Sequence, residues 1–167
     1  HAAAPAMTLI ENTLMTSHSE DIVNRWGIIN FDNVKEKTKD IVSEFDVRTP
    51  TLDNAAASLS GGNLQKFVIG REILQKPRVF VVNQPTWGVD AAAAAFIRQT
   101  ILNLASHDSA VVVISQDLDE LFEICDTFAV LTNGRLSKLH DIRSLSSEDV
   151  GLLMGGSDLD LKNHDKA

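Results

Sequence analysis

A serine followed by two glycines marks the part of the sequence best suited to contact an anion. Ser60, Gly61 and Gly62 precede a stretch, 63–75, whose pattern predicts a helix. Unpaired backbone N–H groups at the start of a helix point outward, and the helix dipole favours a negative charge there. Glycine lets a phosphate approach the backbone without a Cβ in the way. The same residues also fit an ordinary helix start with Ser60 as the N-cap, so alone they are weak evidence for a site.

Amide side chains follow two apolar runs further along the chain. The run 78–82 predicts a buried parallel strand, and Asn83 and Gln84 come directly after it. The run 110–115 predicts a second buried strand, which Gln116 follows. Taken alone, these amide residues are interpreted as the ends of strands or the start of the next helix.

The remaining elements place these residues in an α/β fold. A capping-box spacing predicts a short helix near Met7, and Asp90 is positioned to cap a helix that runs to about Ala105. Other helices are predicted at about 33–45, 117–124 and 147–154. Asn133-Gly134 predicts a hairpin between 128–132 and 135–139. Strands that alternate with helices and end in a hairpin indicate a mainly parallel sheet with helices on both faces and an antiparallel edge.

Composition excludes several classes of protein. The 167 residues carry 15 basic and 23 acidic side chains, a net charge of −8, which argues against nucleic acid as a partner. Cys125 is the only cysteine, so no intrachain disulfide can form. The five histidines have no metal-ligand spacing, and the apolar runs are too short to cross a bilayer. Because the chain begins with His1, we expect a fragment or a processed product.

The order and spacing of these segments resemble the ATPase domains of ABC transporters. In that family a signature motif precedes the Walker B strand, the D-loop and a strand that ends in the switch histidine. Residues Leu59–Lys66 resemble the signature motif, Val79–Gln84 the Walker B strand and Pro85–Asp90 the D-loop. The residues of this signature-like segment are most similar to those of importers of simple sugars and nucleosides, whose ATPase subunit carries two fused ATPase halves. The chain resembles the C-terminal half of such a subunit.

The resemblance implies a partial P-loop NTPase fold. It covers roughly Met7 to Gly155, so we expect an incomplete ABC ATPase domain over 1–155 and a disordered tail over 156–167. No Gly-x-x-x-x-Gly-Lys-Ser/Thr loop, which cradles phosphates in this family, occurs in the sequence. That loop lies upstream of the signature motif in the family, and its absence fits a chain that begins in mid-domain.

Three positions depart from the family pattern. The Walker B strand ends in Asp-Glu in the family, whereas here Asn83 stands at the Mg²⁺ position and Gln84 at the position of the catalytic glutamate. Amides keep nearly the same shape but lose the negative charge and the basicity. Gln116 stands at the switch histidine and cannot carry a positive charge. We therefore expect a degenerate site, and the isolated chain is expected to be inactive and to bind no ATP or Mg²⁺.

The family's assembly implies a different role for the signature motif. ABC ATPase halves pair head to tail, with each ATP between the phosphate loop of one half and the signature of the other. By this resemblance Ser60, Gly61, Gly62 and Gln65 contact a nucleotide held by the partner half, and Asp90 contacts the opposing half. Trp87, at a position often basic or polar in relatives, is interpreted as a buried or interface aromatic.

The resemblance implies part of an importer's ATP-binding subunit, which couples ATP binding and hydrolysis to transport of a sugar or nucleoside. ATP and Mg²⁺ would serve the complete assembly. The expected partners are a second ATPase half, membrane permease subunits and, indirectly, a solute-binding protein. The expected location is cytoplasmic, at the inner face of the cell membrane. The main alternative is a non-functional or regulatory remnant. A non-transport ABC ATPase of DNA repair or translation is disfavoured by charge, and an unrelated α/β binding protein requires chance spacing.

Overall fold

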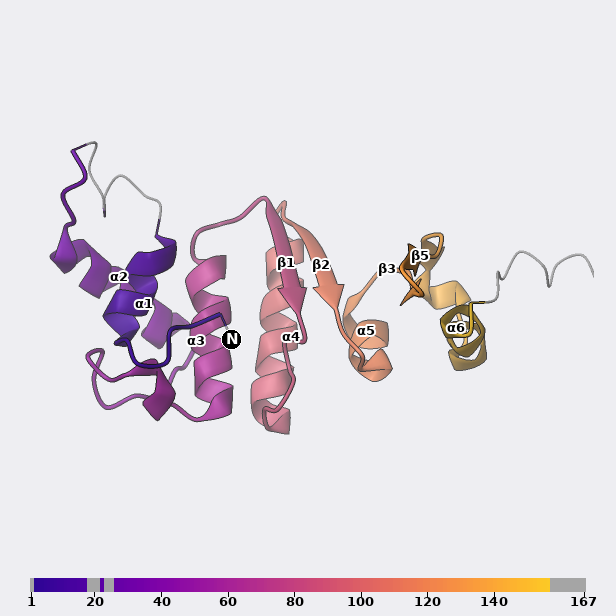
Figure 1. Ribbon diagram of the computed structural model, residues 1–167, viewed down its shortest axis with the longest axis horizontal. Helices are drawn as coiled ribbons and strands as arrows, with labels where there is room; N and C mark the ends of the chain where they lie inside the picture. The colour runs from indigo at the N-terminus through magenta and orange to yellow at the C-terminus, as the bar shows by residue number, and fades with distance from the viewer. Residues whose placement is uncertain (1, 18–21, 23–25, 157–167) are drawn as a thin grey trace, which may run out of the picture. The chain divides into compact units, whose positions relative to one another are not determined.

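The computed structural model describes residues 2–17, 22 and 26–156, which form two compact units, His1–Gln116 and Asp117–Ala167 (Figure 1). The elements of the first unit are α1 (Leu9–Thr16), α2 (Phe31–Glu44), the 3-10 turn η1 (Ala56–Ser58), α3 (Gly61–Ile73), β1 (Val79–Asn83), α4 (Ala91–Ala105) and β2 (Ala110–Ile114). Those of the second unit are α5 (Leu118–Ile124), β3 (Thr127–Phe128), β4 (Leu131–Thr132), β5 (Arg135–Leu136), β6 (His140–Asp141), the 3-10 turn η2 (Ile142–Ser144) and α6 (Ser147–Met154). Residues 157–167 of the expected tail lie outside the described residues.

Local capping signals predict the helix starts well. Thr8 and Glu11 form the expected capping box of α1, and Asp90 caps α4 by accepting a hydrogen bond from the Ala93 N–H at 2.9 Å. Helix α2 begins two residues earlier than predicted, because the Asn30 side chain accepts a bond from the Asn33 N–H and serves as its N-cap. Within the described residues, no helix combines the length and the apolar character needed to span a bilayer.

Helices α1, α2 and α3 pack together around an apolar cluster. Its buried members are Leu9, Ile41, Phe45, Val47, Ala56 and Phe67. Glycine allows α3 to approach α2 closely, since a Cβ at Gly70 would lie 2.5 Å from ring atoms of Phe45. This packing fixes the axis of α3 and therefore the position of the turn at its N-terminus.

A buried arginine ties the start of the chain to α3. The Arg71 guanidinium donates to the carbonyl oxygens of Asn12 at 3.0 Å and Ala2 at 2.8 Å, and its Nε donates to the Glu72 carboxylate at 2.8 Å. These bonds satisfy a charge that is only 3% exposed. The N-terminal segment and α1 are thereby held on the same side of α3.

Strands β1 and β2 form a parallel pair, as the sequence predicts. The register places Val81 beside Val112 and Asn83 beside Ile114, and α4 packs against β2. The prediction that both strands are buried on both faces is wrong for the described residues. Phe80 is buried, but the alternating side chains of Val79, Val81, Val112 and Ile114 are exposed. These four side chains are left open to solvent in the described part of the chain, so the covering of the strands is incomplete there.

The second unit contains the predicted hairpin in a shortened form. Asn133 and Gly134 both have positive φ, as a two-residue hairpin turn of this type requires, and Leu131 lies opposite Leu136. At the next pair only one backbone bond remains, from the Ser137 N–H to the Val130 carbonyl at 2.8 Å, because the Val130 N–H donates to the Ser137 side chain at 2.9 Å. Phe128, expected in the same hairpin, pairs instead with His140 in the separate pair β3–β6.

Candidate functional site

The turn of residues 60–62, here called the signature turn, lies at the surface. Ser60 is the N-cap of α3, and its Oγ accepts hydrogen bonds from the backbone N–H and the side-chain amide of Asn63 at 3.4 and 2.9 Å. Ser60 and Gly61 are exposed, and Gly62 is half-buried. The turn is therefore accessible to a ligand or a partner, and it is not part of the protein's own core.

The signature turn carries unsatisfied hydrogen-bond donors. The N–H groups of Gly61 and Gly62 have no acceptor among the described residues, as expected for the first turn of a helix. Helix α3 is 13 residues long, so its dipole adds positive potential at this end. Backbone amides so arranged suit a phosphate group, which brings only acceptor oxygens and negative charge.

Close packing against the start of α4 holds the signature turn in place. A Cβ at Gly62 would lie 3.1 Å from the Ala93 Cβ and 3.5 Å from Asp90 Oδ2, and a Cβ at Gly61 would lie 3.4 Å from the Gly88 carbonyl oxygen. Any larger residue at position 62 would push the turn away from α4. The structure thus brings Asp90, predicted from the D-loop, beside the turn.

Asn63 holds the signature turn from the other side, and the sequence analysis did not single it out. Its Nδ2 donates to Ser60 Oγ, while its Oδ1 accepts from the backbone N–H of Arg48 at 2.8 Å. One side chain therefore links the turn to the loop that follows α2. A short amide three residues after an N-cap serine is the only local signal of this role, because the contact with Arg48 spans 15 residues.

Lys66 is a second positioning residue that the sequence did not reveal. Its Nζ donates to the Asp46 carboxylate at 3.0 Å and to the Asp46 carbonyl at 3.2 Å, and it lies 4.7 Å from the centre of the Phe96 ring. The hydrogen bond from Lys66, helped by its charge, lowers the pKa of Asp46. Lys66 thus connects α3 to the end of α2 and to α4.

The carboxyl ends of β1 and β2 form a separate region, here called the strand-end site. Asn83 is the last residue of β1, and Gln84 leaves the strand with φ +51 while its N–H donates to the Ile114 carbonyl at 2.7 Å. Gln116 is exposed and follows β2. Because the two strands are parallel neighbours, Asn83, Gln84 and Gln116 follow the same edge of the sheet, where α/β proteins bind ligands.

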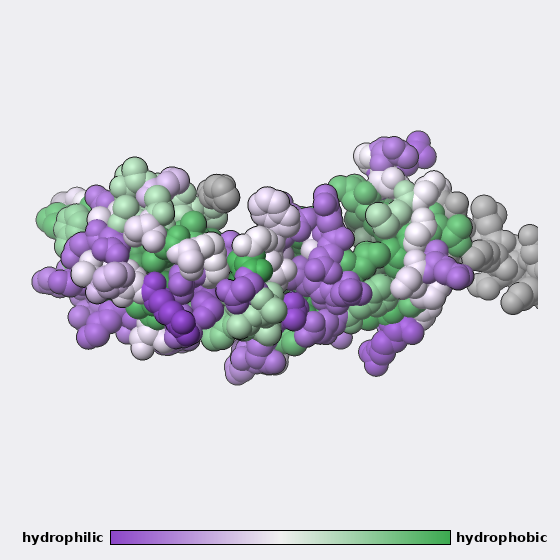
Figure 2. Space-filling view, turned by 90° about the horizontal axis from the view of Figure 1, so that it is seen from below, coloured by the Kyte–Doolittle hydropathy of each residue, from purple (hydrophilic) through white to green (hydrophobic). Residues whose placement is uncertain are grey.

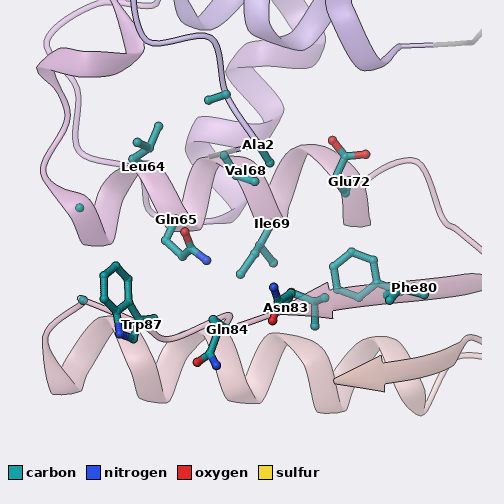
Figure 3. A pocket seen from close by; sticks show the side chains of 15 residues that line it. Ala2, Leu64, Gln65, Val68, Ile69, Glu72, Phe80, Asn83, Gln84 and Trp87 are labelled. Atoms are coloured by element: carbon teal, nitrogen blue, oxygen red, sulfur yellow. The ribbon is translucent and has the colours of Figure 1, made fainter. Parts of the chain in front are cut away.

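A cavity of about 550 Å³ separates α3 from β1 (Figure 3). Predicted site residues Gly61, Gln65, Asn83 and Gln84 belong to its lining, and its apolar wall includes Leu64, Val68, Ile69, Phe80 and Val82. The Gln65 side chain points from α3 toward β1, whereas Gln84 points away from α3. The structure thus assembles part of the predicted set around one cavity. Ser60, Gly62, Asp90 and Gln116 lie outside its lining.

The strand-end site does not fit Mg²⁺. Asn83 and Gln84 offer neutral amide oxygens, whereas Mg²⁺ in nucleotide sites is held through carboxylates and phosphates. Within the described part of the chain, no group of three or more His, Cys, Asp or Glu side chains is arranged to hold a metal ion. The signature turn, in contrast, fits the phosphates of a nucleotide, because its amides are unpaired and exposed.

Sequence comparison relates the chain to known ATP-binding proteins. No protein-family model matches the chain. It is 31% identical to the nucleoside import ATP-binding protein NupA of Lactococcus lactis over 92% of its length. It is 33% identical to the galactose/methyl galactoside import ATP-binding protein MglA of Mannheimia succiniciproducens over 84% of its length. The chain spans only 30% and 28% of these relatives.

The fold is found among solved structures. The dimeric ATP-binding cassette MJ0796 bound to ADP and phosphate matches 86% of the chain with a TM-score of 0.68, and the chain covers 60% of that cassette. At 19% identity this match shows the fold alone. It confirms the predicted ABC ATPase fold. The similarity to NupA and MglA confirms the predicted resemblance to ATP-binding proteins of importers. The chain belongs to the ABC transporter ATPases, as the C-terminal half of an ABC ATPase, and the relatives it matches are ATP-binding proteins for nucleoside and galactoside import.

Proposed function

We propose that this chain donates its signature turn in trans to a nucleotide held by a partner ATPase half. The complete protein would be the ATP-binding subunit of an ABC importer, coupling ATP binding and hydrolysis to transport of a sugar or a nucleoside. Residues 1–155 would form one incomplete ATPase domain. NupA and MglA, the relatives named above, are import ATP-binding proteins for such substrates.

The exposed signature turn carries this proposal. Two unpaired amide N–H groups, on Gly61 and Gly62, stand beside the Ser60 hydroxyl on a surface that the described residues leave open. The bond from the Asn63 side chain fixes the position of the turn, and the Ala93 side chain leaves no room for a side chain at position 62. Fixed donors that need no rearrangement are the kind of group that stabilises charge on a transferring phosphoryl group.

The strand-end site supports the second half of the proposal, that this chain's own nucleotide site is degenerate. Gln84 cannot act as a general base and Asn83 cannot supply a charged Mg²⁺ ligand. Loss of general base catalysis alone typically lowers a rate ~10²–10⁴-fold. The two nucleotide sites of the assembly would therefore be unequal, and only the one completed by the signature turn would turn over rapidly.

The proposed assembly has further components. ATP and Mg²⁺ would be bound chiefly by the partner half, since the strand-end site lacks the charges for Mg²⁺. Permease subunits in the membrane and a solute-binding protein would complete the importer. The ATPase subunit would sit in the cytoplasm against the inner face of the membrane.

Replacement of Ser60 by arginine in the complete ATP-binding subunit tests the proposal. Arginine would fill the space for the nucleotide's terminal phosphate and remove the hydroxyl, so ATPase activity should fall by ~10²-fold or more. Ser58→Arg is a matched control, because Ser58 is also exposed but its hydroxyl bonds only to the Ala55 carbonyl. Equal activity in the two variants would contradict the trans role.

The alternative, a regulatory or non-functional half, is favoured by one observation. No carboxylate stands at either Asn83 or Gln84, so this half lacks its own catalytic groups. The two functions differ in the effect of Ser60→Arg. A half that takes no part in catalysis predicts unchanged ATPase activity and unchanged transport.

A further inference from the structure

Asp46 occupies a backbone position that suits glycine better than aspartate. It follows the C-cap residue of α2 with φ +48, in the left-handed region. Two backbone bonds close the helix there, from the Asp46 N–H to the Ser43 carbonyl at 3.5 Å and from the Val47 N–H to the Val42 carbonyl at 3.0 Å. Helix ends with this pattern usually carry glycine at the left-handed position, because a Cβ is strained there. Backbone preference therefore does not explain an aspartate.

The charge of Asp46 is also unfavourable at this place. The carboxyl end of a helix carries partial negative charge, so a carboxylate at the end of the 14-residue α2 is repelled. The Asp46 side chain is 63% exposed, and an ion pair so exposed contributes little to stability, because water screens it. The stability of the fold thus gives no reason for this residue. A residue that opposes its local environment commonly serves a function.

Asp46 holds the ammonium group of Lys66 with its main chain and its side chain together. The Lys66 Nζ donates to the Asp46 carboxylate at 3.0 Å and to the Asp46 carbonyl at 3.2 Å, and the Lys66 side chain is only 12% exposed. The same Nζ lies 4.7 Å from the centre of the Phe96 ring on α4. Because a lysine stem is flexible, these bonds from the end of α2 keep the charge in one position between α3 and α4.

The loop that carries Asp46 also supports the signature turn at a second point. Arg48, two residues further on, donates its N–H to Asn63 Oδ1 at 2.8 Å, and the Asn63 side chain donates to Ser60 Oγ at 2.9 Å. Asn63 and Lys66 are three residues apart on α3, so they lie on the same face of the helix. Loop 46–48 therefore holds this face of α3 at two points just behind the turn.

We propose that Asp46 is a positioning residue of the phosphate contact, which fixes the signature turn through Lys66 although it makes the end of α2 less stable. This inference rests on the proposed function, because the position of the turn matters only if its amides meet a phosphate. Amide donors stabilise a transferring phosphoryl group only within hydrogen-bond distance, so a displacement of a fraction of an ångström lowers the rate. Asp46 itself touches no nucleotide.

Asp46→Gly in the complete subunit tests the inference by separating stability from activity. Glycine removes both the strain and the repelled charge, so the variant should unfold at the same or a higher temperature than the unaltered subunit. Its kcat for ATP hydrolysis should nevertheless fall about threefold, and kcat/KM equally, because the turn acts on the transferring phosphoryl group. A fall in activity together with a lower unfolding temperature would overturn the inference, since it would show a merely structural role.

Asp108→Gly is the matched control. Asp108 is likewise exposed and has φ +62, but its carboxylate makes no hydrogen bond or ion pair with a described residue. Glycine at position 108 removes the same kind of strain, so this variant should also keep or gain stability, and its ATPase activity should not change. An equal loss of activity in Asp108→Gly and Asp46→Gly would overturn the inference.

A double-mutant cycle shows whether Asp46 acts through Lys66. Lys66→Met keeps the aliphatic stem and removes the charge, so kcat should fall about fivefold, and Asp46→Gly added to it should lower kcat no further. Lys66→Arg should retain most of the activity, because a guanidinium can donate to both oxygens of Asp46. Independent, multiplicative losses would overturn the inference, since they would mean that glycine acts only by loosening the loop.

The result with Ser60→Arg separates this inference from the proposed function. If Asp46→Gly is as active as Asp108→Gly while Ser60→Arg abolishes activity, the inference about Asp46 fails and the proposed function stands. If Ser60→Arg also has no effect, the proposed function fails as well.

Discussion

The signature turn and the strand-end site differ in the chemical groups that they offer to a nucleotide. At the turn, the Ser60 hydroxyl and two unpaired glycine amides lie at the surface, with Asp90 beside them. At the strand ends, the fold is equally regular, since β1 and β2 pair in register and Gln84 bonds to Ile114. These strand ends carry no charge, because Asn83 and Gln84 end in neutral amides, and the proposed function assigns these positions to a metal ligand and a general base.

This difference separates the two things that a nucleotide site requires. A shape that contacts phosphate can be made from backbone alone, so it depends on packing and on glycine at two positions. Chemistry at the phosphate needs ionised side chains, and no packing substitutes for them. In the space-filling view, apolar residues lie directly beside strongly polar ones on the surface (Figure 2).

Restoring the missing charges should produce the largest effect. In the Ser60→Arg subunit, the combined changes Asn83→Asp and Gln84→Glu should raise the residual ATPase rate by ~10²-fold or more, because a general base and a metal ligand return to this chain's own site. Steady-state phosphate release measures this. Asn83→Asp alone is the control, since it restores only the metal position. No gain from the double change would mean that the strand-end site fails for a reason other than charge.

Disturbing the scaffold under the signature turn should have the next largest effect. Gly70→Ala would place a methyl group 2.5 Å from ring atoms of Phe45, so α2 and α3 must separate at a cost of about 1–3 kcal/mol. The complete subunit carrying Gly70→Ala should therefore unfold at a lower temperature than the unaltered subunit. Gly151→Ala is the matched control, because a Cβ there meets nothing within 4 Å and favours helix α6 by up to about 1 kcal/mol. Equal stability of the two variants would contradict the packing described.

The smallest of these effects should come from Asn63. Asn63→Asp keeps an acceptor for the Arg48 N–H but cannot donate to Ser60 Oγ, whereas Asn63→Ala loses both bonds. Each bond contributes about 1 kcal/mol, so we expect kcat/KM to fall about fivefold for aspartate and further for alanine. Activities equal to that of the unaltered subunit would show that the turn needs no side-chain support.

Features that depend on neighbouring residues were predictable from the sequence. The capping box of Thr8 and Glu11 and the N-caps Ser60 and Asp90 all act within three residues, and the structure confirms them. The order of the motifs likewise predicted the ABC ATPase fold. The roles of Asn83, Gln84 and Gln116 at the phosphate stay predictions, since their placement at a sheet edge says nothing of catalysis.

Features that depend on distant partners were not predictable. The valines of β1 and β2 have the composition of buried strands, but burial depends on what covers the sheet, and no local pattern reports that. The bond of Asn63 to Arg48 and the interruption of the hairpin by Ser137 each depend on one side chain reaching another segment. Such contacts form only when folding brings the two segments together, so the local sequence gives no sign of them.

The most direct test asks whether Ser60 lies against a nucleotide held by another half. Ser60→Cys would be combined with Cys125→Ser, which leaves position 60 with the only thiol of this chain. Cys125 is a poor nucleophile, because burial, with the charges of Asp126 and Glu120, raises the pKa of its thiol. N-ethylmaleimide labelling of the thiol introduced at position 60 is then followed by peptide mass spectrometry in the complete subunit.

Mg²⁺ and a non-hydrolysable ATP analogue should slow labelling at position 60 at least about tenfold, since the terminal phosphate would cover the thiol. Protection should disappear when the phosphate-loop lysine of the partner half is replaced by alanine. Labelling that is unaffected by nucleotide, or protection that survives loss of the partner's lysine, would contradict the trans role of the signature turn.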